Sequence, residues 1–212
     1  MKRALILLGG DKPEPRFLHD LASTCDYVLC ADSGLDAAIA ADIHVDGVIG
    51  DFDSAEKSSV DHMLGKNIPH IVYPAIKDDT DGMACVRHVL AQKPNEVVLT
   101  GASGGRLDHY LGNVQLLVYL KKRGIQAKIE EPEFEAWAVN GEHTVVGNEN
   151  DLLSVLQLTE NLVVSESGVF YPLDHHAFEF GYPLGVSNVM TQEEAVIHVH
   201  EGWALVLHYH HA

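Results

Sequence analysis

Aspartates that follow short apolar runs are the residues of this chain most suited to chemistry. Each of them lies in a loop that also contains Gly, Ser or Thr: Asp32, Asp51, Asp53, Asp78, Asp79, Asp81 and Asp108. If a fold gathers these loops at one edge, the carboxylates repel one another unless they share cations. Hard oxygen ligands suit Mg²⁺, which usually keeps coordination positions open for substrate phosphates. The pattern therefore indicates metal-assisted phosphate chemistry.

Strand-like and helix-like segments alternate up to about residue 130. Continuous apolar runs predict strands covered on both faces, at residues 4–8, 27–31, 45–49, 71–73, 97–100 and 127–129. Segments with helical periodicity lie between them, at residues 16–23, 35–41, 55–64, 80–91 and 106–123. This alternation predicts an α/β domain with a doubly wound, mainly parallel sheet and right-handed crossovers.

The residue pattern changes after residue 130, because no long segment with helical periodicity follows. Short β-rich runs occur instead, at residues 136–139, 144–146, 152–158, 162–164, 169–171, 195–199 and 204–207. Asn140-Gly141 and Glu201-Gly202 are typical of hairpin turns. We therefore predict two domains: an α/β domain over residues 1–132, and a C-terminal all-β sandwich domain over residues 133–212.

The acidic motifs all fall where predicted parallel strands end. Ligands of open parallel sheets bind beyond the carboxyl ends of the strands, so the fold would gather these motifs at one site. Aspartate is also common in such loops because it caps helices. For Asp81 or Asp108 alone, helix capping explains the aspartate as well as a metal or phosphate role does. For the Asp51–Asp53 pair, capping explains only one of the two carboxylates. The pair therefore favours a metal or phosphate role.

A glycine-rich loop, residues 101–105, links a predicted strand to the longest predicted helix. Its backbone can approach a ligand closely, and the helix N-terminus offers N–H groups to an anion. Arg106 follows and could bind a phosphate bidentately. The loop is not a Walker A motif, and a plain Gly-rich turn is the alternative. Gly9-Gly10 is a weaker candidate of the same kind. Lys77 could neutralise a phosphate, or pair with Asp78 or Asp79.

Composition narrows the classes of partner. The 212 residues carry a formal charge of −17, which disfavours nucleic acid and anionic membranes. No apolar run approaches the roughly 18 residues of a membrane span. The three cysteines form no Cys-x-x-Cys pair, as expected in a reducing cytoplasm.

Histidines cluster towards the end of the sequence: His198, His200, His208, His210 and His211. The i, i+2 spacing would place the members of a pair on one strand face, where they could bind zinc. No third ligand is evident from the sequence, however. A solvated strand face followed by a loose tail is the favoured interpretation.

The acidic and glycine-rich motifs, taken in order, resemble those of the thiamin pyrophosphokinase family. The matching elements lie at residues 31–34, 46–54, 77–81, 100–109, 168–173 and 185–188. The resemblance implies a homodimer that transfers pyrophosphate from ATP to thiamin with Mg²⁺. It also implies three groups of site residues. The catalytic and metal-binding group is Asp51, Asp53 and Asp81; the ATP group is Gly10, Asp32, Ser33, Ser103, Gly104, Gly105, Arg106 and Asp108; the thiamin group is Ser187, Asn188 and Asp78.

Two other functions would use the same acidic motifs. Residues 48–54 also resemble the Asp-x-Asp element of aspartyl-phosphate phosphatases, with Asp51 as nucleophile. A non-catalytic module that binds nucleotide and metal would use the same acidic loops. The products distinguish the three functions. The pyrophosphokinase would form AMP only with thiamin, the phosphatase would release phosphate from esters, and the binding module would turn nothing over.

Overall fold

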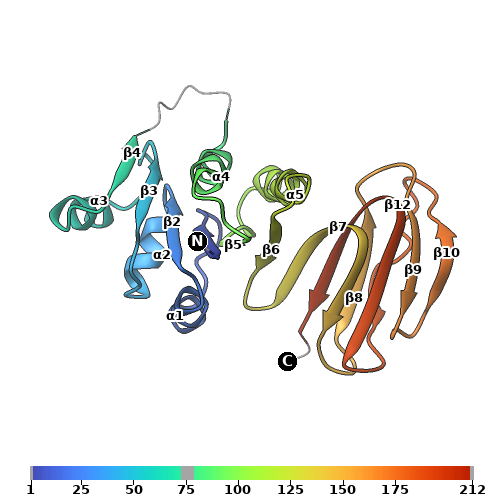
Figure 1. Cartoon of the computed structure of the whole chain (residues 1–212). Coiled ribbons are helices and arrows are strands. Elements are labelled where there is room, and N and C mark those ends of the chain that lie inside the picture. Colours follow the sequence, from blue (N-terminus) through green and yellow to red (C-terminus); the bar gives the residue numbers. More distant parts are fainter. Residues whose placement is uncertain (1, 73–78, 211–212) are drawn as a thin grey trace. The chain divides into compact units, whose positions relative to one another are not determined.

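The computed structural model describes residues 2–72 and 79–210 of the chain (Figure 1). The chain divides into two compact units between Pro132 and Glu133. The first unit alternates strands and helices, whereas the second is built from antiparallel strands. The predicted fold class, an α/β sheet followed by an all-β sandwich, is confirmed.

The sheet of the first unit is entirely parallel, in the order β6-β5-β1-β2-β3-β4. Its strands are β1 (Arg3–Leu7), β2 (Tyr27–Ala31), β3 (Gly47–Gly50), β4 (His70–Val72), β5 (Glu96–Thr100) and β6 (Gln126–Glu130). The chain first adds β2, β3 and β4 on one side of β1, and then adds β5 and β6 on the other side. The strand order therefore reverses next to β1, and such a switch point opens a crevice at the carboxyl ends of the strands.

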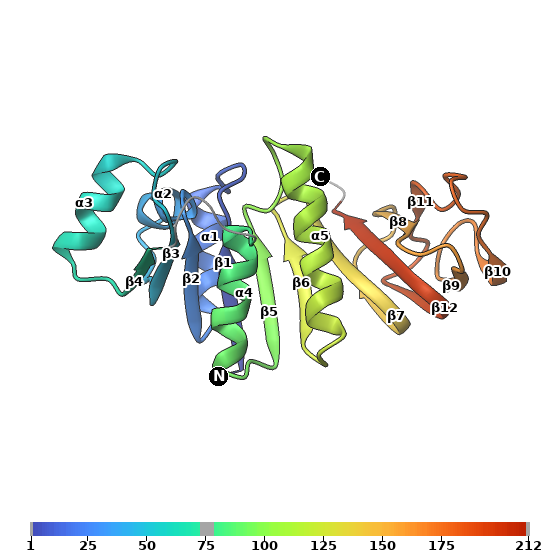
Figure 2. The ribbon, with the colours of Figure 1, turned by 90° about the horizontal axis from the view of Figure 1, so that it is seen from above.

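Helices cover both faces of this sheet, as Figure 2 shows. One face carries α1 (Pro15–Ser23), α2 (Gly34–Ala40) and α3 (Lys57–Gly65); the other carries α4 (Asp81–Ala91) and α5 (Leu107–Lys121). Burial on both sides explains the continuous apolar character of the central strands. The edge strand β4 differs from this prediction, because its side chains are exposed, including 65% of Val72.

The second unit is organised around one long strand, β12 (Glu194–Tyr209). Along one edge, β12 pairs with β7 (Phe134–Val146) over nearly its whole length. Its other edge pairs first with β9 (Val163–Ser167) and then with β8 (Leu152–Gln157). The two shorter strands, β10 (Leu173–Ala177) and β11 (Asn188–Val189), extend β9 and β8. Ile197 and Val206, from the two halves of β12, share one buried core, as expected of a sandwich.

The two predicted hairpin turns are wrong. Asn140-Gly141 lies inside β7, and Glu201-Gly202 lies inside β12. Both glycines have positive φ angles, 102° and 79°, and the β7–β12 register shifts between Val199 and Ala204. The glycines therefore let long strands bend and form a bulge instead of reversing the chain.

The interpretation of the C-terminal histidines as a solvated face and loose tail is wrong for His208. This residue belongs to β12 and is fully buried. Its imidazole Nε2 lies 2.8 Å from Oδ2 of the buried Asp151, so the ring has a polar partner inside the protein. His211 lies outside the described residues. Within residues 2–72 and 79–210, no helix combines the length and apolar character needed to cross a membrane.

Candidate active site

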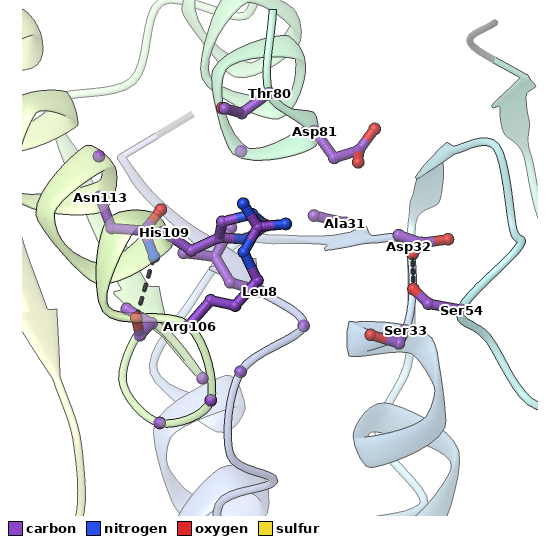
Figure 3. Close-up of a pocket in the computed structure, with 18 of the residues that line it drawn as sticks. Leu8, Ala31, Asp32, Ser33, Ser54, Thr80, Asp81, Arg106, His109 and Asn113 are labelled. Atoms are coloured by element: carbon purple, nitrogen blue, oxygen red, sulfur yellow. Dashed lines mark hydrogen bonds between the residues drawn. The ribbon is translucent and has the colours of Figure 1, made fainter. Parts of the chain in front are cut away.

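A cavity of about 700 Å³ lies at the carboxyl ends of the central strands of the first unit (Figure 3). The loops after β1, β2, β3 and β5 line it, together with the N-terminal turns of α4 and α5. Its position is the switch point of the sheet, where ligands of this fold class bind. The volume suits a small organic ligand or a nucleotide.

Three aspartates form a cluster at one side of this cavity. Carboxylate oxygens of Asp32, Asp51 and Asp53 all lie within 4.8 Å of one another. Phe52 has a left-handed backbone conformation, with φ of 62°, so the chain turns between its two acidic neighbours. The turn brings the N–H of Asp53 to Oδ1 of Asp51 at 3.2 Å. Asp51 and Asp53, which do not line the cavity themselves, therefore adjoin it through Asp32.

Asp32 carries the clearest sign that this cluster fits a cation. The hydroxyl of Ser54 donates a hydrogen bond to Oδ2 of Asp32, whereas Oδ1 is buried and has no hydrogen-bond partner among the described residues. Repulsion within the cluster raises the pKa of Asp53, and Asp51 is the main cause. An unsatisfied oxygen among close carboxylates fits a hard dication such as Mg²⁺.

Asp81 begins α4 but is not the cap of that helix. The capping group is Thr80, whose hydroxyl accepts the N–H of Met83 at 3.1 Å. Asp81 is therefore not needed for capping. Figure 3 shows it on the same side of the cavity as Asp32 and Ser54, whereas Arg106, His109 and Asn113 come from the opposite side.

The glycine-rich loop after β5 is held by a buried carboxylate, Glu131. Its oxygens accept five hydrogen bonds, from the N–H groups of residues 101–103 and from the hydroxyls of Thr100 and Ser103, at 2.7–3.3 Å. Burial raises the pKa of Glu131, and the N–H donors oppose that shift. The N–H and hydroxyl of Ser103 thus bond Glu131, and its neighbours Gly104 and Gly105 line the cavity.

The loop after β1 is joined to the same glycine-rich loop. The N–H of Gly10 donates to the carbonyl of Gly101, and the N–H of Asp11 to that of Ser103, both at 2.8 Å. A Cβ atom on Gly10 would lie 2.1 Å from the carbonyl oxygen of Ser103, so only glycine permits this approach. Gly10 therefore contributes to the cavity wall through its backbone.

Arg106 and Asp108 form a bidentate ion pair at the cavity. Nε of Arg106 lies 3.0 Å from Oδ1 of Asp108, and Nη2 lies 2.5 Å from Oδ2. The guanidinium lowers the pKa of Asp108 to about 2. Asn113 donates its amide to the carbonyl of Ala102 at 2.9 Å, which ties α5 to the glycine-rich loop. This side of the cavity thus presents a guanidinium that could bind an anion.

The remaining predicted residues divide between the two units. Ser33 lines the cavity of the first unit, whereas Asp78 lies outside the described residues. Ser187 and Asn188 belong to the second unit, where Ser187 is exposed and Asn188 is buried. The side-chain amide of Asn188 accepts a hydrogen bond from the N–H of Tyr171 and donates one to the carbonyl of Tyr171, each at 3.0 Å.

Several residues at this site were missed from the sequence: Asp11, Ser54, Thr80, His109, Asn113 and Glu131. Most of them adjoin motifs that the sequence did identify, so proximity in sequence was the available signal. Glu131 had no such signal, because Glu130-Glu131 reads as part of the boundary between the two domains.

Comparison with known proteins decides the family. A family model described as thiamin pyrophosphokinase, catalytic domain, matches residues 18–129, which is more than half of the chain. The chain belongs to the thiamin pyrophosphokinase family. A second model, described as the vitamin B1 binding domain of thiamin pyrophosphokinase, matches residues 142–203.

Relatives of this thiamin pyrophosphokinase family member extend over its whole length. Thiamine pyrophosphokinase of Bacillus subtilis (strain 168) is 28% identical over 214 residues, covering 98% of each chain. A crystal structure of thiamine pyrophosphokinase from Bacillus subtilis has the same fold, with a TM-score of 0.87, 23% identity and full coverage of both chains. Thiamin pyrophosphokinase from Candida albicans gives a TM-score of 0.85 at 13% identity, over 98% of this chain and 89% of that chain.

Proposed function

We propose that this member of the thiamin pyrophosphokinase family transfers pyrophosphate from ATP to the hydroxyl of thiamin, giving thiamin diphosphate and AMP. The observation that carries the proposal is the division of one cavity into two electrostatic sides. Asp32 presents a buried, unsatisfied oxygen at one side, and Arg106 presents a guanidinium at the other. A metal–polyphosphate ligand has the matching charge pattern.

Asp51, Asp53 and Asp81 would hold Mg²⁺, and the geometry adds Asp32 to this set. Mg²⁺ would neutralise the phosphate charge and polarise the phosphorus that is attacked. Arg106 would bind phosphate oxygens after giving up part of its bidentate ion pair with Asp108. The loops at Gly10, Gly104 and Gly105 would lie against the triphosphate.

The reaction forms one bond between the thiamin hydroxyl oxygen and the β-phosphorus of ATP. The bond between that phosphorus and the oxygen bridging it to the α-phosphorus breaks, and AMP departs with this oxygen. Asp81 would accept the proton of the hydroxyl as the new bond forms. Most of the remaining rate acceleration would come from alignment of the reacting atoms.

Thiamin, the acceptor, would be bound by Ser187, Asn188 and Asp78 in a homodimer. Exposed aromatic side chains of the second unit support an apolar contact surface: Phe170 is 64% exposed and Tyr171 67%. Asn188 would position Tyr171 through its two hydrogen bonds. The unbridged thiols of Cys25, Cys30 and Cys85 support the cytoplasm as the compartment.

Incubation of the protein with ATP, Mg²⁺ and thiamin tests this function. We expect equal amounts of AMP and thiamin diphosphate, and no AMP when thiamin or Mg²⁺ is omitted. Release of phosphate from phosphate esters without thiamin would favour the aspartyl-phosphate phosphatase. Binding of ATP with Mg²⁺ but no AMP would favour the non-catalytic module.

A further inference from the structure

A second group of possible metal ligands lies in the second unit, outside the cavity described above. It consists of Glu135, His208 and His210, whose ligand atoms all lie within 4.8 Å of one another. Glu135 of β7 and His208 of β12 are direct cross-strand partners. His210 is two residues beyond His208, and its N–H still bonds the carbonyl of Glu133 at 3.2 Å. The strand register thus brings all three side chains to one face.

The hydrogen bonding of His208 resembles that of a metal-bound imidazole. Its Nε2 lies 2.8 Å from Oδ2 of Asp151, a fully buried carboxylate, so this nitrogen carries the proton. The other nitrogen, Nδ1, is buried and has no hydrogen-bond partner among the described residues. A carboxylate that fixes the tautomer of a histidine, and leaves the opposite nitrogen as a ligand, is a common support of metal sites.

The distance between His208 and Glu135 also favours a bridging ion. Nδ1 of His208 lies 3.8 Å from Oε2 of Glu135, which is too long for a hydrogen bond. Ligands about 2.0–2.1 Å from a tetrahedral zinc ion lie roughly 3.3–3.4 Å from each other. A shift of a few tenths of an ångström would bring these two atoms to that spacing, and a ligand atom of His210 lies within 4.8 Å of both.

The loop between β7 and β8 packs closely against the His208–Asp151 pair. A Cβ atom on Gly147 would lie 2.5 Å from Nε2 of His208 and 2.7 Å from Oδ2 of Asp151, so a side chain there would displace the pair. The N–H of Asn148 donates to the same Asp151 oxygen at 2.8 Å. His210, in contrast, is exposed and gives an ion access from solvent.

We propose that Glu135, His208 and His210 bind a transition-metal dication of the zinc type, with Asp151 orienting His208 and water completing the coordination. Two imidazoles and one carboxylate suit Zn²⁺ better than Mg²⁺. The site is thus chemically distinct from the all-carboxylate cluster of the first unit. It does not depend on the proposed reaction.

Zinc titration of the full-length, tag-free protein tests the site. The affinity is measured by competition with a chromophoric zinc chelator, in excess Mg²⁺ so that the cluster of Asp32, Asp51 and Asp53 is occupied. We expect one tightly bound Zn²⁺ per chain, and at least ~10-fold weaker binding after His210→Ala. This substitution removes an exposed side chain and leaves the core intact. Asp151→Asn should weaken binding by roughly 10- to 100-fold through His208.

The matched control is His198→Ala, because His198 belongs to another histidine group. Its ring stacks on that of His200, with centroids 4.2 Å apart, and His200 stacks on His175. We expect His198→Ala to bind zinc as the parent does. Absence of bound zinc, an unchanged affinity of His210→Ala, or a loss confined to His198→Ala would each overturn the proposal. Absence of zinc would instead indicate a His208 imidazolium lying between the Asp151 and Glu135 carboxylates.

Discussion

The Oε1 atom of Glu131 lies 2.7 Å from the amide nitrogen of Ala102. This is the shortest of the five hydrogen bonds by which one buried carboxylate fixes the glycine-rich loop. A carboxylate has only acceptor oxygens, which suits a loop that directs several N–H groups towards it. The loop therefore has its shape before any ligand arrives.

Replacement of Glu131 by Gln should weaken ATP binding more than it slows turnover. The amide of Gln places an NH₂ group against backbone N–H donors, so at least one buried donor loses its acceptor. We expect a loss of about 1–3 kcal/mol in the free energy of unfolding and a ~10-fold rise in the KM for ATP. Steady-state kinetics and urea unfolding measure the two effects. Glu130→Gln is the control, because Glu130 pairs with Arg3 and Lys128 away from the loop; equal effects of both substitutions would contradict this role.

Asp53→Asn should raise the Mg²⁺ concentration needed for half-maximal activity by ~10-fold or more. The substitution removes one carboxylate from the cluster with Asp51 and Asp32, and an amide is a weaker ligand for a hard dication. A Mg²⁺ titration at saturating ATP and thiamin measures the change. Asp61→Asn, on the exposed face of α3, should leave the titration unchanged. A curve for Asp53→Asn that matches the parent would exclude this residue as a ligand.

Asp81→Asn should lower kcat by at least ~100-fold, the lower end of the range for a group that accepts a proton in the transition state. Helix α4 should stay intact, because Thr80 caps it. Single-turnover measurements separate this chemical step from ATP binding. The neighbouring Asp79 pairs with Arg87 at 3.1 Å, so Asp79→Asn provides the control in the same loop. Activity of Asp81→Asn within a few-fold of the parent would refute the role.

Glu166→Gln should make the second unit less sensitive to alkaline pH. Burial raises the pKa of Glu166 to about 7, against the usual value of 4.5, although a hydrogen bond from Asn188 opposes the shift. Between these values the folded protein holds a proton that the unfolded chain releases, so the free energy of unfolding falls as pH rises through this window. The total change is about 3 kcal/mol.

The Gln variant lacks this titration, so its stability relative to the parent should improve by a few kcal/mol between pH 5 and pH 8. Both tryptophans of the chain, Trp137 and Trp203, lie in the second unit and report its unfolding by fluorescence. Parallel pH profiles for the two proteins would show that Glu166 ionises normally.

Local sequence patterns predicted most of the first unit. Its central strands are covered on both faces, so each forms a continuous apolar run, such as residues 4–7, whereas the helices bury only part of their surface. The clustering of Asp32 with Asp51 and Asp53 followed from the same topology, because parallel strands deliver their carboxyl ends to one edge. The exposure of the edge strand β4 did not follow, since it depends on how far other elements cover the faces of the sheet at its edge.

The second unit was harder to predict because its long strands bend. Asn140-Gly141 and Glu201-Gly202 have the composition of turns, and only the pairing of β7 with β12 on both sides of them shows that the strands continue. His208 has the sequence context of a surface residue, and its partner Asp151 is 57 positions away in the sequence. The role of Glu131 also depends on contacts that join sequence-distant segments.

The long strand β12 has a consequence for the order of assembly. It pairs with β7, β8 and β9, so neither layer of the sandwich is complete without it. During synthesis on the ribosome, residues 134–189 would emerge with their apolar faces uncovered until residues 194–209 follow. Binding of chaperones to nascent chains should therefore persist through this interval and end only when β12 has left the exit tunnel.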